Sequence, residues 1–162
     1  MIQISSSPWA IQEMFQADTL AHDNKWMPVG TVGHARPLMF DTTHGSWVSI
    51  LRAQGAGTIQ RHRHAAPVTA WTLDGAWGYR EHDWVARAGS FVYEPAGHIH
   101  TLYIHPEPGS MTAVFHVFGP LVYVDADGVA EGYEDVFIRL ENYAKHCRSV
   151  GLGEDWIRSL VR

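Results

Sequence analysis

The feature that most constrains the fold is a long central region of short strand-like runs. Between Trp26 and Val124, apolar or alternating segments are separated by Gly, Pro, Asp and Asn, which favour turns. We expect strands over 37–42, 46–54, 57–64, 67–73, 76–84, 90–94, 99–105, 111–118 and 120–124. Asp74-Gly75 separates two of these runs and predicts a two-residue hairpin turn. Many short strands at this spacing are typical of an all-β sandwich or a small barrel.

Helices are expected on both sides of this β region. Near the amino end, residues 8–16 favour a short helix with Ser7 as its N-cap. Near the carboxyl end, one apolar stripe at helical spacing is formed by Val136, Leu140, Tyr143, Cys147 and Val150. Gly151 is expected to end this helix, and residues 153–162 to form another. Because Cys147 lies on the stripe, it is predicted to be a buried structural thiol.

The composition restricts the class of protein. A chain of 162 residues with 46% hydrophobic residues is expected to form one domain. We divide it into an arm with a short helix (1–25), a barrel (26–130) and a helical segment of the same domain (131–162). The net charge of −5 argues against nucleic-acid binding, and no apolar run reaches the roughly 18 residues of a membrane span. A single cysteine and no secretory signal predict a cytoplasmic protein.

The stretch TIQRHRHAAPV contains two histidines at alternate positions. Successive side chains of a strand point to opposite faces, so His62 and His64 would share one face while Arg61 and Arg63 share the other. In a helix the two histidines would lie about 200° apart and could not bind one ion. Because the neighbourhood is β, the pattern favours a metal site, and neutral imidazole is the commonest protein metal ligand.

A third ligand is available downstream. His98 and His100 follow Pro95 and Gly97, which mark a turn before a new strand. A turn followed by a strand can direct a ligand into a barrel interior. Both histidines have the same parity, so the strand pattern alone leaves the choice between them open.

These two segments resemble the paired motifs of the cupin family, G-x5-H-x-H-x3,4-E-x6-G and G-x5-P-x-G-x2-H-x3-N. The second motif is matched at Gly89, Pro95, Gly97 and His100, with Ile104 in place of the final Asn. The first motif is matched at His62, His64 and Gly75. Its leading Gly is displaced to Gly55 or Gly57, and Thr69 or Val68 stands in place of its Glu.

The resemblance implies a double-stranded β-helix, or jelly-roll, barrel with His62, His64 and His100 as metal ligands. A three-histidine centre without Glu is typical, in this family, of ferrous dioxygenases that cleave C–C bonds, similar to those that act on acetylacetone and 2,4'-dihydroxyacetophenone. The stretch from Phe115 to Phe137, with FGPL before a DADG turn, also resembles that group.

The activity implied is O2-dependent cleavage next to a carbonyl of a small, aromatic hydroxyketone similar to 2,4'-dihydroxyacetophenone, which would give 4-hydroxybenzoate and formate. An acetylacetone-type diketone is the alternative substrate. Fe(II) is the metal implied, and Zn or Ni could occupy the same site. Three neutral imidazoles leave three positions on iron for substrate oxygens and O2, and they preserve its charge of +2 for an anionic chelating substrate.

Six further residues are candidates for the site. Glu81 and Glu94 could take the substrate proton or orient an imidazole, although strand carboxylates often face solvent. Residues that could contact the substrate are Arg80, Tyr93, Trp77 and Trp71. Core packing is the alternative role for each aromatic residue.

Two other function classes remain open. A metal-dependent cupin without redox chemistry, an isomerase or lyase, would work with zinc and without O2. A ligand-binding sensor cupin is less expected, because sensor cupins are usually attached to another domain. A homodimer or homotetramer is expected, because pairing through sheet edges is favoured.

Overall fold

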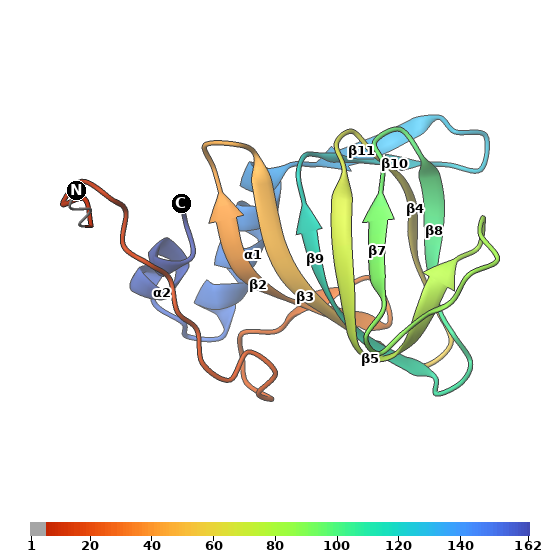
Figure 1. Cartoon of the computed structure of the whole chain (residues 1–162), viewed down its shortest axis with the longest axis horizontal. Coiled ribbons are helices and arrows are strands. Elements are labelled where there is room, and N and C mark those ends of the chain that lie inside the picture. Colours follow the sequence, from red (N-terminus) through yellow and green to blue (C-terminus); the bar gives the residue numbers. More distant parts are fainter. Residues whose placement is uncertain (1–5) are drawn as a thin grey trace, which may run out of the picture.

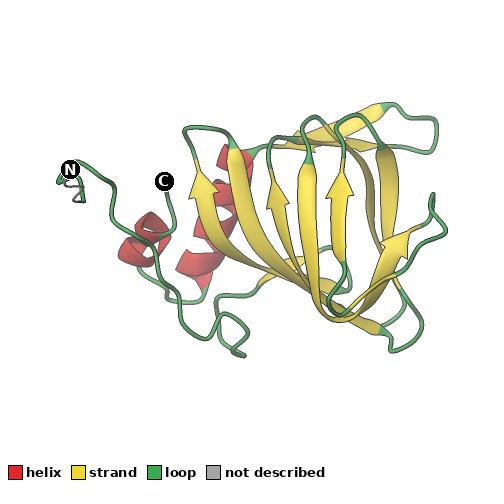
Figure 2. Cartoon of the chain, viewed as in Figure 1, coloured by secondary structure: helices red, strands yellow, loops and turns green. Residues whose placement is uncertain are grey.

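In a computed structural model, which describes residues 6–162, eleven strands form one curled antiparallel sheet and two helices follow it (Figure 1, Figure 2). The strands are β1 (Met27–Val29), β2 (Gly33–Asp41), β3 (Ser46–Gln54), β4 (Thr58–His64), β5 (Val68–Tyr79), β6 (Ala86–Arg87), β7 (Phe91–Glu94), β8 (Ile99–Ile104), β9 (Ser110–Val117), β10 (Leu121–Val124) and β11 (Ala130–Glu134). The helices are α1 (Val136–Ser149) and α2 (Glu154–Ser159). The predicted all-β barrel with C-terminal helices is therefore confirmed.

The strand β5 belongs to both layers of the curled sheet. Its first part, Val68–Gly75, pairs with β9 and β7, whereas its last part pairs with β6 and β8. The register with β9 shifts between Thr72 and Asp74, which marks a β-bulge at the point where the strand changes layers. One strand thus connects the β1-β2-β3-β9 layer with the β8-β4-β10-β11 layer.

The predicted hairpin at Asp74-Gly75 is wrong, because these residues lie inside β5. A type I′ hairpin turn needs positive φ at both central residues. Gly75 has a φ of +73°, but Asp18 is the one non-glycine residue with positive φ in the described part of the chain, so Asp74 lacks the required conformation. Asp74 and Gly75 instead continue the ladder with β9, opposite Thr112 and Met111, after the register shift that follows Thr72.

The predicted helix over residues 8–16 is also absent. The segment forms only a turn, in which the Ala10 N–H donates to the carbonyl of Ser7 at 3.2 Å. Its apolar side chains Trp9, Ile11 and Phe15 are exposed. An isolated helix of this length is marginal without a packing partner, which explains the extended arm.

The β region extends further than the sequence predicted. The segment expected to be helical from residue 131 begins with β11, which pairs with β10. The helix α1 begins at Val136, where the Asp135 carboxylate accepts a hydrogen bond from the Ile138 N–H at 2.8 Å. Asp135 therefore acts as an N-cap and separates the last strand from the helix.

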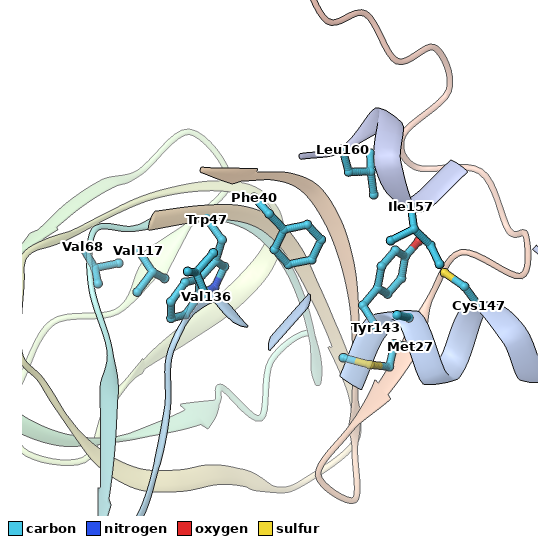
Figure 3. Close-up of a cluster of buried hydrophobic side chains, with 11 residues drawn as sticks. Met27, Phe40, Trp47, Val68, Val117, Val136, Tyr143, Cys147, Ile157 and Leu160 are labelled. Atoms are coloured by element: carbon cyan, nitrogen blue, oxygen red, sulfur yellow. The ribbon is translucent and has the colours of Figure 1, made fainter. Parts of the chain in front are cut away.

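The helices cover one end of the barrel. A continuous cluster of buried side chains runs from Val68 and Val117 in the barrel to Ile157 and Leu160 on and just after α2 (Figure 3). Gly151, with a φ of +75°, follows α1 and ends it as predicted. Neither helix of the described chain has the length and apolar character that crossing a membrane requires.

The single cysteine offers a test of this packing. Cys147 is fully buried on α1, and burial raises the pKa of its thiol. Both effects suppress the reactive thiolate, so we expect Cys147 of the native protein to react only slowly with a thiol reagent. In denaturant the same reagent should label one thiol per chain. Rapid native labelling, followed by absorbance of the released chromophore, would contradict the packing of α1.

Candidate metal centre

The two histidines of β4 point into the barrel. His62 and His64 are buried, and Arg63 between them is exposed, as the alternation of a strand requires. His100 on β8 lies directly opposite His62 in the antiparallel pair. Neighbouring strands therefore place three imidazole rings on one interior surface.

The three rings converge closely. The His62 ring centroid lies 4.8 Å from that of His64 and 4.9 Å from that of His100. The Nε2 atoms of His62 and His64 are 3.2 Å apart, and one nitrogen from each of the three rings lies within 4.8 Å of the others. Nitrogens at this spacing can all reach one ion at metal–nitrogen distances of about 2.1 Å.

Two of the rings are held in orientation by neighbours. The Nδ1 atom of His62 lies 2.7 Å from the carbonyl oxygen of Gln60. Because a carbonyl only accepts, Nδ1 donates its proton, and the lone pair is left on Nε2, which faces the centre. The ring of His100 stacks on that of Tyr79, with centroids 3.7 Å apart and an interplanar angle of 2°.

Burial also keeps these imidazoles neutral. Burial, followed by the neighbouring His64, lowers the pKa of His62 to about 4. Burial is likewise the largest cause that lowers the pKa of His100 to about 2, and His62 and His64 contribute next. Both rings are therefore unprotonated at neutral pH, the state that offers a lone pair to a metal.

A carboxylate lies beside the three rings. Glu94, at the end of β7, is buried, and its Oε1 accepts a hydrogen bond of 2.7 Å from the Tyr79 hydroxyl. Its Oε2 lies 3.1 Å from Nε2 of His64 and 3.5 Å from Nε2 of His100. Tyr79 thus positions both the carboxylate and the His100 ring.

The donor set fits a divalent metal ion. Within residues 6–162, neither Nε2 of His100 nor Oε2 of Glu94 has a hydrogen-bond partner, although both atoms are buried. An unsatisfied buried polar group costs about 1–3 kcal/mol. A cation held by the three Nε2 atoms would be stabilised by the adjacent carboxylate oxygen and would remove both costs.

A small cavity of about 90 Å³ opens beside the centre. Its apolar walls come from both sheet layers and include Trp47, Leu51, Ile59, Leu102, Phe115, Val117 and Leu121. Its polar lining residues are Ser49, His62, His64, Tyr79, Tyr123, Glu134 and Arg139. A molecule in this cavity would therefore contact His62 and His64 directly and lie against largely apolar walls.

Residues 16–121 match the family model of the ChrR cupin-like domain. The chain belongs to the ChrR cupin-like family. This match confirms the cupin assignment expected from the paired histidine motifs.

Solved structures share the fold of this cupin. An RmlC-like cupin protein from Ralstonia eutropha JMP134 is 30% identical over 79% of this chain and 84% of that chain, with a TM-score of 0.74. Acetylacetone dioxygenase from Acinetobacter johnsonii is 17% identical over 90% and 99%, with a TM-score of 0.72. The anti-sigma ChrR of Rhodobacter sphaeroides, in complex with SigE, is 17% identical over 62% and 55%, with a TM-score of 0.53. Among curated proteins, none matches the sequence significantly.

The remaining histidine and carboxylate candidates of the cupin lie apart from the centre. His98 is exposed and precedes β8, so strand parity does not apply to it. Glu81 is exposed, and its Oε1 accepts from Arg61 Nη1 at 2.8 Å while its Oε2 accepts from the Thr101 N–H at 2.8 Å. The structure therefore brings Glu94, but not Glu81, to the three histidines.

The candidate substrate contacts do not line the cavity. Trp71 and Tyr93 are exposed on the outer surface, where Trp71 packs on Phe91, and Arg80 is exposed as well. Trp77 is fully buried, and its indole N–H donates to Thr72 Oγ1 at 2.9 Å. The two exposed aromatic residues alternate with inward-facing ones along β5 and β7, so their side chains point away from the barrel interior.

Sequence reasoning missed the cavity residues Ser49, Tyr123, Glu134 and Arg139. Ser49 and Tyr123 are inward-facing strand residues. Their neighbours depend on which strands pair, and short-range sequence patterns do not reveal the strand pairing. Glu134 lies on β11, which was expected to be helical. Arg139 was detectable in principle, because it follows the apolar residue Val136 by three positions on α1.

Proposed function

We propose that the chain is an O2-dependent dioxygenase that cleaves a carbon–carbon bond in a small enolisable diketone. The observation that carries this proposal is the convergence of three buried imidazole nitrogens beside the Glu94 carboxylate, with His62 and His64 also lining a largely apolar cavity. The shared fold of acetylacetone dioxygenase from Acinetobacter johnsonii supports it.

His62, His64 and His100 would hold a ferrous ion, and zinc or nickel could bind to the same donors. When bound, the ion would supply Lewis acidity toward two substrate oxygens and redox chemistry toward O2. The net reaction adds both atoms of O2 to the diketone. The bond between the central carbon and one carbonyl carbon breaks, and a carboxylic acid and a 2-oxoaldehyde form, so that atoms and electrons balance without another reductant.

Glu94 is the residue that would take the proton of the substrate. Enolisation removes a proton from the carbon between the two carbonyl groups, and Oε2 of Glu94 lies next to the centre where that carbon would be held. The hydroxyl of Tyr79 fixes the carboxylate through Oε1. The walls of the adjoining cavity are largely apolar.

The size of the cavity favours the aliphatic diketone over the aromatic hydroxyketone. Its volume is about 90 Å³, and acetylacetone is the smaller of the two candidate substrates. Acetylacetone has no ring and places both oxygens at one edge. We therefore propose acetylacetone-like compounds first, with 2,4'-dihydroxyacetophenone as the comparison substrate.

Oxygen uptake tests this function directly. Protein loaded anaerobically with Fe(II) should consume one O2 per acetylacetone when the two are mixed with air-saturated buffer, and zinc-loaded protein should consume none. Uptake with 2,4'-dihydroxyacetophenone alone would move the substrate assignment to the aromatic ketone. No uptake with either compound, while iron is shown to be bound, would overturn the dioxygenase proposal.

Glu94→Gln should separate proton transfer from metal binding. The amide keeps the shape and the hydrogen bond to Tyr79 but cannot accept the proton, so we expect turnover to fall by about 100-fold or more. Iron content, measured by elemental analysis, should stay near that of the wild type. Loss of the iron together with activity would show instead that Glu94 is a metal ligand.

A metal- or ligand-binding module without turnover is the second candidate, and the match to the ChrR cupin-like domain favours it. Such a module would bind the ion with the same three histidines. It would show metal-dependent stabilisation but no oxygen uptake with either ketone.

A further inference from the structure

A second polar cluster lies on the wall of the cavity formed by β10, β11 and α1. Glu134 is buried, and its Oε2 accepts a hydrogen bond of 3.0 Å from the Tyr123 hydroxyl. Nη1 of Arg139 lies 3.3 Å from Oε1 and 3.1 Å from Oε2 of the same carboxylate. All three residues line the cavity.

This cluster is close to the proposed metal centre. Tyr123 on β10 is the direct cross-strand partner of His62, and their ring centroids lie 6.4 Å apart. Burial, followed by Glu134, raises the pKa of Tyr123 well above its usual value, so its hydroxyl stays protonated and remains a donor. A small molecule bound at the histidines would therefore have its far end near Tyr123, Glu134 and Arg139.

Two donors at this cavity are unused by the protein. Ser49 on β3 lines the cavity with an exposed fraction of 4%, and its Oγ has no hydrogen-bond partner within the described chain. Nε of Arg139 is also buried without a partner among residues 6–162. Such groups are normally satisfied in native proteins, because each unsatisfied one destabilises the fold.

A structural role explains only part of the cluster. The ion pair between Glu134 and Arg139 links the end of β11 to the first turns of α1, and Tyr123 connects β10 to the same carboxylate. Neither link uses Ser49 Oγ or Arg139 Nε. These two donors therefore call for a partner that enters the cavity.

We propose that Ser49 and Arg139 recognise an oxygen atom at the end of the substrate remote from the metal, a specificity site that rests on the proposed diketone function. The hydroxyl of Ser49 and the Nε–H of Arg139 both donate to this oxygen. The preferred substrate is then a small diketone that carries a further hydrogen-bond acceptor, with an apolar segment between the two polar ends.

Charge selects the kind of acceptor. Arg139 is already paired with the Glu134 carboxylate, so these two side chains together offer the Nε–H donor without a net charge. An additional carboxylate on the ligand would lie buried beside this neutral pair without compensation. The remote acceptor is therefore a neutral hydroxyl or carbonyl oxygen.

Calorimetry with two matched ligands tests the site. Iron-loaded protein under nitrogen is titrated with an alkyl-substituted acetylacetone and with its derivative that carries a hydroxyl at the far end of the alkyl chain. We expect the derivative to bind roughly fivefold more tightly, the factor that one net hydrogen bond provides. Ser49→Ala should remove this preference, and Arg139→Lys, which retains the cation beside Glu134 but lacks Nε–H, should reduce it. Ser159→Ala, on the exposed surface of α2, is the matched control.

The outcomes distinguish the two proposals. Equal binding of both ligands by the wild type would overturn the specificity site while leaving the diketone function standing. Equal weakening of the binding of both ligands by Ser49→Ala would also overturn the specificity site and leave the diketone function standing. If neither ligand binds to iron-loaded protein, the result contradicts the diketone function and the specificity site together.

Discussion

Replacing His62 with alanine should reduce the affinity for a divalent metal by more than about 100-fold, because loss of even an outer-sphere partner typically costs 10–100-fold. His62 is close to both other rings and is the one held by a backbone carbonyl, so its Nε2 contributes an already oriented lone pair. The measurement is the iron or zinc content per chain after equilibrium dialysis against a graded metal buffer.

His98→Ala is the matched control for this substitution. His98 lies close to His100 in the sequence but is exposed and outside the centre, so its removal should leave the metal content unchanged. Full metal binding by His62→Ala protein with native circular dichroism would contradict the three-histidine centre. Metal loss in the His98→Ala protein would identify the turn before β8 as part of the site.

The second large effect is expected at Gly75, where β5 changes layers. Alanine there should lower the free energy of unfolding by about 2–6 kcal/mol, the sum of left-handed backbone strain and overpacking. The φ of Gly75 is +73°, and an added Cβ would lie 2.1 Å from the backbone carbonyl oxygen of Ser110. Because that neighbour is backbone rather than a flexible side chain, the clash cannot be relieved locally. Urea unfolding monitored by fluorescence measures the change.

Gly45→Ala isolates the contribution of the backbone conformation. Gly45 has nearly the same φ, +72°, but an added Cβ there would meet no atom within 4 Å among the described residues. Its alanine variant should therefore lose only about 1–2 kcal/mol. Equal losses at the two positions would show that the close approach of Ser110 is unimportant.

The interior histidines were predictable because alternation is a local property. Once 58–64 is a strand, His62 and His64 must share a face, and this needs no knowledge of the partner strands. The choice of His100 over His98 came from motif spacing. The structure gives its physical reason, since His100 lies within β8 and pairs with His62, whereas His98 lies in the preceding turn.

Features that depend on strand pairing could not be read from the sequence. Asp74-Gly75 has the composition of a hairpin turn, and only its pairing with Thr112 and Met111 of β9 shows that the strand continues through it. The exposed positions of Trp71 and Tyr93 likewise follow from which face of β5 and β7 the second layer covers. Glu94 was recognised as a candidate, but its hydrogen bond to Tyr79 joins strands whose register no local pattern specifies.

The passage of β5 through both layers has a consequence for how the barrel unfolds. The histidines lie on β4 and β8 in one layer, the Glu94 carboxylate lies on β7 in the other, and Tyr79 at the end of β5 contacts both groups. An ion bound at the histidines is thereby linked through β5 to the layer that carries the helix-covered core. Metal binding should then stabilise the whole barrel rather than two strands alone. The domain should unfold as a single cooperative unit whose melting temperature rises with metal concentration.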